Sequence, residues 1–73
     1  LYPNPTRDVW IFVNPGTAIK QIQVFDAFGK TVLNLKPNST EVEINAQILS
    51  QGLYLAKVIL TNHSETTVKI IKQ

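Results

Sequence analysis

The chain has 73 residues and no cysteine, so its apolar residues must hold together one small domain without disulfides. Its single histidine is too few for a structural zinc site, and no apolar run approaches the ~20 residues of a membrane-spanning helix. The net charge of +2 is spread along the chain without a basic stripe, so we expect no nucleic acid partner and no membrane insertion.

Six segments are rich in Val, Ile, Thr and aromatic residues, and turn signals separate them at intervals typical of all-β domains. They cover residues 8–13, 19–25, 30–35, 41–44, 53–60 and 66–72. The proline-rich start, residues 1–5, adds a seventh strand if it pairs at an edge. We therefore predict an antiparallel two-sheet sandwich, with a small closed barrel of the OB type as the alternative.

The first predicted strand carries apolar side chains on both faces. Val9, Ile11 and Val13 share one face, which we assign to the core. Trp10 and Phe12 then point outward, and adjacent exposed aromatics form a candidate contact for a partner or a sugar. The alternative is that a cover loop or the N-terminal proline segment packs over them.

The strand predicted at 19–25 leads into a hairpin. Ile22 and Val24 share its core-facing side. The following Asp26–Gly29 segment has the length of a tight turn, and Gly29 can adopt the positive φ that such turns require. The next strand is therefore expected to return antiparallel to this one.

The segment between the fourth and fifth predicted strands is the one candidate helical turn. Asn45 is a plausible N-cap, and Gly52 closes the turn. Ile48 and Leu49 are expected to enter the core. The fifth strand that follows is almost wholly apolar, so we expect both of its faces to be covered.

No group of residues in the sequence points to catalysis. His63 lies in a polar turn, with no nucleophile or orienting acid predicted beside it. Asp8 and Asp26 lack the clustered oxygen ligands of a calcium loop and suit turn capping. Glu41 and Glu43 share a face that alternation predicts to be solvated. We therefore expect no catalytic residue, no metal, no cofactor and no enzymatic activity.

Several short motifs follow one another in a distinctive order. They are Tyr2-Pro3-Asn4-Pro5, the strand Val9–Val13, Ile22–Asp26 with Gly29–Val32, Ile44 with Leu49–Tyr54, and the terminal Lys69–Gln73. No motif is specific alone, but in this order and spacing the whole chain resembles the type A C-terminal sorting domain of the type IX (Por) secretion system of Bacteroidetes bacteria.

The resemblance implies an all-β fold, namely a small antiparallel immunoglobulin-like β-sandwich of six to seven strands, formed by residues 1–73 as a single domain. It implies a covalently linked N-terminal cargo domain that passes through the periplasm and the outer membrane to the cell surface or medium. The partners it implies are the type IX translocon and a sortase-like peptidase that can remove the domain.

The resemblance also assigns candidate sorting-motif residues. They are Pro3, Asn4, Pro5, Gly29, Lys30, Gly52, Tyr54, Lys69 and Lys72. Gly52 and Tyr54 also suit structural roles, as a turn and as a core residue with a satisfied hydroxyl. Lys69 and Lys72 suit the protection of an edge strand, but we favour recognition, for example by strand addition. The alternative function is an immunoglobulin-like adhesion or carbohydrate-binding module that uses Trp10 and Phe12.

Overall fold

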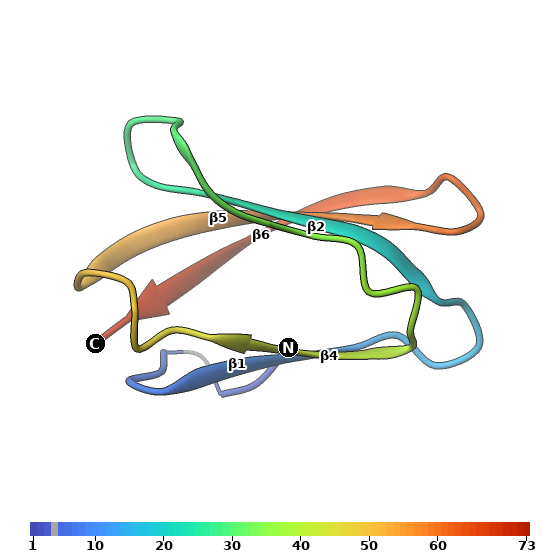
Figure 1. The fold of residues 1–73 in the computed structure, drawn as a ribbon, viewed down its shortest axis with the longest axis horizontal. Coiled ribbons are helices and arrows are strands. Elements are labelled where there is room, and N and C mark those ends of the chain that lie inside the picture. The colour runs from blue at the N-terminus through green and yellow to red at the C-terminus, as the bar shows by residue number, and fades with distance from the viewer. Residues whose placement is uncertain (4) are drawn as a thin grey trace.

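The computed structural model describes residues 1–3 and 5–73, and it arranges them in two antiparallel sheets without a helix (Figure 1). One sheet pairs β1 (Val9–Val13) with β4 (Glu41–Asn45). The other has the order β3-β2-β5-β6, formed by β2 (Ile19–Phe25), β3 (Thr31–Leu35), β5 (Gly52–Leu60) and β6 (Glu65–Lys72). The two sheets lie one over the other. This confirms the predicted all-β, two-sheet arrangement and excludes the alternative of a closed barrel.

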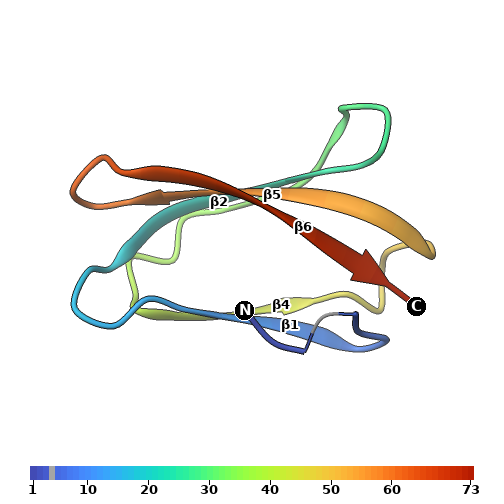
Figure 2. The ribbon, with the colours of Figure 1, turned by 180° about the vertical axis from the view of Figure 1, so that it is seen from behind.

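The described part of the N-terminal segment connects the two sheets instead of forming a seventh strand (Figure 2). Tyr2 pairs with Ile11 on β1 through two backbone hydrogen bonds of 2.9 and 2.6 Å. Thr6 then donates its N–H to the Ile71 carbonyl on β6 at 3.0 Å and accepts a hydrogen bond from Gln73 N–H at 2.7 Å. Tyr2 is therefore bonded to one sheet and Thr6 to the other on this side of the sandwich.

The core lies between the two sheets and is formed by alternate side chains of their facing sides. The largest fully buried side chains are Trp10, Ile19, Ile22, Ile44, Ile70 and Val24. The predicted inward positions of Ile22 and Val24 are thus confirmed. With the other buried side chains of the core, they provide the hydrophobic stabilisation that a domain of this size requires.

The prediction that Trp10 and Phe12 face outward is wrong, since their side chains are 0% and 5% exposed. The register between β1 and β4 explains the error. Trp10 pairs with the buried Ile44, while Ile11 pairs with the exposed Glu43. Directly paired residues share a face of the sheet, so the carboxylates that must stay in water fix the orientation of β1. The face expected in the core carries Val9, Ile11 and Val13 and points away from it.

The predicted helical turn before β5 is also wrong. The Asn45 side chain accepts a hydrogen bond from Gln47 N–H at 2.9 Å, and Leu49 N–H donates to the Ala46 carbonyl at 3.1 Å. These bonds form a tight non-helical loop, because Asn side chains favour local turns over helix continuation. Leu49 packs on the core as expected, but Ile48 is 68% exposed.

Only one face of β5 is covered. Its inward residues, Tyr54, Ala56 and Val58, are buried, whereas Leu53 and Leu55 on the outer face are exposed. The expectation that both faces are covered is therefore wrong. No helix in the described part of the chain has the length and apolar character needed to cross a membrane.

Candidate functional site

The turn between β2 and β3 is the first part of the candidate site. The Asp26 carboxylate accepts hydrogen bonds from Phe28 N–H and Lys30 N–H, both at 2.9 Å. Gly29 has a φ of 83°, a left-handed conformation that few residues other than glycine adopt readily. These constraints shape a turn that presents the Phe28 side chain almost completely to solvent, with 96% of it exposed.

The loop between β4 and β5, residues 46–51, is the second part. Tyr54 anchors this loop, because its hydroxyl donates a hydrogen bond to the Ser50 carbonyl at 2.7 Å. The Tyr54 ring packs edge-on against Trp10, with 6.2 Å between ring centroids. The structural role expected for Tyr54 is thus confirmed. Gly52, with a φ of 145°, begins β5.

The turn and the loop border a shallow cleft of about 460 Å³. It is lined by Asp26, Ala27, Phe28, Val32, Ile48, Leu49, Ser50, Gln51, Gly52, Leu53 and Tyr54. Phe28, Ile48 and Leu53 are its exposed large apolar side chains. We name the surface formed by these three residues the apolar end.

The end of β6 joins the same region, since the turn, the loop and the C-terminus lie at one end of the sandwich (Figure 1). Lys72 donates a hydrogen bond from Nζ to the Ala46 carbonyl at 2.9 Å, so it ties β6 to the 46–51 loop. On the outer face of β6, Lys69 pairs with Leu55 and Ile71 pairs with Leu53. These pairs extend the exposed apolar surface from the cleft along β5 and β6.

The structure therefore brings together several of the sorting-motif residues assigned by resemblance. Gly52 and Tyr54 line the cleft, Gly29 and Lys30 lie in the turn beside it, and Lys72 holds its loop. Pro3 and Pro5 are exposed, and Pro5 directly precedes the Thr6 that pairs with β6. Asn4, also assigned to the motif, lies outside the described residues.

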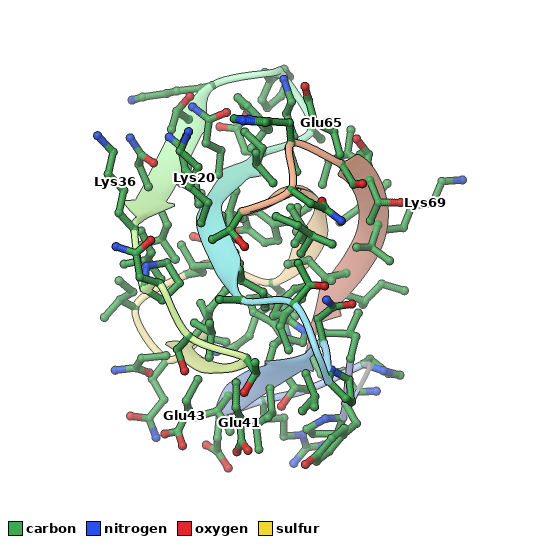
Figure 3. All side chains as sticks on the ribbon, turned by 90° about the vertical axis from the view of Figure 1, so that its right-hand side faces the viewer. Lys20, Lys36, Glu41, Glu43, Glu65 and Lys69 are labelled. Atoms are coloured by element: carbon green, nitrogen blue, oxygen red, sulfur yellow. The ribbon has the colours of Figure 1, made fainter. Side chains whose placement is uncertain are left out.

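The charged side chains lie on the outer surfaces of both sheets. Glu41 and Glu43 point away from the core on the two-stranded sheet, whereas Lys20 and Lys36 lie with the four-stranded sheet (Figure 3). The Lys57–Glu65 ion pair, 3.1 Å between Nζ and Oε1, is solvent-exposed, so it stabilises the fold little. Among the described residues that line the cleft, Asp26 is the charged one.

Other polar residues considered in the sequence have local roles. Asp26 caps its turn, as predicted, and Asp8 accepts a hydrogen bond from the Gln47 amide at 3.2 Å. His63 occupies the β5–β6 turn, with a φ of 70° and its N–H donated to the Leu60 carbonyl. Among the described residues, no three His, Cys, Asp or Glu side chains are grouped as metal ligands.

Phe28 and Ile48 were not identified from the sequence as candidate binding residues. For Phe28 the signal is its position between Asp26 and Gly29. This position lies at the tip of a turn, where side chains are normally exposed to solvent. The helical interpretation of residues 45–52 places Ile48 in the core. Turn chemistry at Asn45 was the competing signal.

The fold and this surface together define the chain as a small two-sheet β-domain that exposes Phe28, Ile48 and Leu53 at one end. The sequence matches the Por_Secre_tail family, described as the secretion system C-terminal sorting domain, over residues 1–73. The chain therefore belongs to the family of C-terminal sorting domains of the type IX (Por) secretion system. No curated protein matches the sequence.

Proposed function

We propose that this domain is the signal by which the type IX translocon recognises a cargo protein and directs it across the outer membrane to the cell surface or medium. The family match over residues 1–73 supports this function. In this proposal the cargo is covalently linked upstream of the domain, and a sortase-like peptidase removes the domain after translocation. The domain itself acts by binding and has no catalytic activity.

The observation that carries the proposal is the apolar end. Phe28 and Ile48 are 96% and 68% exposed, and they project from two loops whose backbones are fixed by local hydrogen bonds. Exposed apolar side chains grouped on a small domain are typical of a protein–protein contact. A preformed surface also loses little conformational entropy on binding. We infer that the translocon binds this end.

The finer description of the fold belongs to the same proposal. We infer that the two sheets form a reduced immunoglobulin-like sandwich. The connection of both sheets by the N-terminal segment supports this description. The carbohydrate-binding alternative relied on exposed Trp10 and Phe12 side chains, and both are buried.

A fusion experiment tests the sorting function. Residues 1–73 are attached to the C-terminus of a fluorescent protein that carries an inner-membrane leader, and the fusion is expressed in a bacterium with a type IX system. We expect fluorescence at the surface or in the medium. The signal should be lost when residues 60–73 are removed, because this deletes β6, and also in a strain without the translocon.

Retention of the intact fusion in the periplasm would contradict the proposal, provided that circular dichroism of the purified fusion shows a folded domain. Export that persists without the translocon would contradict the assignment to type IX secretion.

A further inference from the structure

β1 has one paired edge and one partly paired edge. In an antiparallel ladder, alternate residues direct their backbone N–H and C=O groups to the same side. Asn14 N–H donates to the Thr40 carbonyl at 2.8 Å, so the even-numbered positions of this segment point toward β4. Ile11 bonds to Tyr2 on the opposite side, so Val13, two residues later, also directs its backbone groups there.

The register shows what would lie opposite Val13. Tyr2 is paired antiparallel with Ile11, so Leu1 lies opposite Phe12, and the residue directly before Leu1 would lie opposite Val13. Within the described residues, no hydrogen bond is present between this side of Val13 and another strand. The Tyr2–Ile11 ladder can therefore continue upstream by one further pair.

A groove of about 400 Å³ lies beside the same position. Leu1, Phe12, Val58 and Val68 contribute apolar side chains to its walls. β1 and β6 contribute residues to its lining, and farther along β6 the Thr6 backbone bonds to Ile71 and Gln73.

We propose that the residues directly preceding Leu1 in the full-length protein form a third strand on the edge of β1 and cover this groove. The occupant follows from continuity with the Tyr2–Ile11 ladder, and a C-terminal sorting domain is by description preceded by the rest of its protein. The first upstream residue exchanges two backbone hydrogen bonds with Val13. The second residue upstream of Leu1 has the same inward orientation as Leu1, because side chains alternate along a strand. Its side chain therefore enters the groove, where an apolar residue fits best.

The pairing has a consequence for sorting. It makes the cargo leave the domain at the Val13 end of β1, whereas the apolar end lies at the other end of the sandwich (Figure 1). A large cargo domain would then leave Phe28 and Ile48 accessible.

Hydrogen exchange on the purified full-length protein tests this proposal. We expect two backbone N–H groups, those of Val13 and of the residue directly preceding Leu1, to exchange at least about tenfold more slowly than in an unstructured peptide. Each is held in the ladder by a hydrogen bond. The variant V13P removes the N–H donor that faces the upstream residue and leaves the β1–β4 hydrogen bonds in place. It should restore fast exchange before Leu1, whereas the matched control V13A should not.

Unstructured exchange before Leu1 in the wild-type protein would overturn the proposal, whether or not V13P folds. Slow exchange at Val13 alone would also overturn it, since another occupant, such as a second copy of the chain, would then cover the edge. The measurement is independent of export, so its failure would leave the proposed sorting function unaffected.

Discussion

The Tyr54 side chain contributes to the core and to the candidate site at the same time. Its ring is buried against Trp10, and its hydroxyl holds the Ser50 carbonyl at 2.7 Å. A buried hydroxyl that keeps its hydrogen bond costs little to desolvate, and the bond fixes the loop that carries Ile48. Tyr54, which the resemblance assigns to a sorting motif, therefore also has a structural role.

Replacement of Tyr54 by Phe separates the two roles. Y54F keeps the ring packing but leaves the Ser50 carbonyl without this donor, so we expect the free energy of unfolding to fall by about 1 kcal/mol. Urea denaturation measures this change. The Y54F fusion should still be exported. Loss of export at unchanged stability would show instead that the hydroxyl is read directly by the translocon.

Individual side chains also show where prediction from sequence was limited. Alternation correctly placed Ile22 and Val24 in the core, because the other face of β2 is largely polar. It failed for Trp10 because both faces of β1 are apolar, and only the pairing with β4 decides between them. Pairing partners are long-range information that one strand's own pattern does not contain.

At the scale of elements, the β2–β3 turn is a tightly held connection in the candidate site. Gly29 has a φ of 83°, and a Cβ atom added there would meet no atom within 4 Å. A substitution at this position therefore acts through backbone strain and not through a clash.

This predicts different outcomes for two substitutions. G29A should lower the free energy of unfolding by about 1–2 kcal/mol, because alanine is strained in the left-handed region. G29N should cost less, since asparagine tolerates that conformation. Urea denaturation of both variants provides the comparison. Equal stability of G29A and the wild type would contradict the turn conformation described above.

The six strands and their antiparallel hairpins follow well from local sequence, because turn residues and β-branched residues mark their limits. The connection before β5 does not, because a short apolar segment suits a helical turn or a loop equally well. The side chain of Asn45 decides for the loop by its hydrogen bond to Gln47 N–H. The cleft could not be predicted, since it depends on how the two loops meet in space.

In the two proposals above, three functions lie in different parts of one small sandwich. The core between the sheets stabilises the fold, the Val13 end of β1 receives the cargo linker, and the apolar end at Phe28, Ile48 and Leu53 contacts the translocon. The connection of both sheets by the N-terminal segment holds these surfaces in a fixed relation. We therefore expect recognition to require the folded domain.

The central claim is that the translocon binds the apolar end, and export of fluorescent fusions with matched surface variants tests it most directly. The double variant F28S/I48S removes two exposed apolar side chains at the cleft, and the control V13S removes one, 40% exposed, at the opposite end. Neither should change stability by more than about 0.5 kcal/mol, which thermal melting of the purified fusions checks.

We predict that F28S/I48S lowers export about tenfold or more, because loss of a central apolar anchor costs an interface about 2 kcal/mol. Export of V13S should remain at the wild-type level. Wild-type export of a folded F28S/I48S fusion would contradict the account.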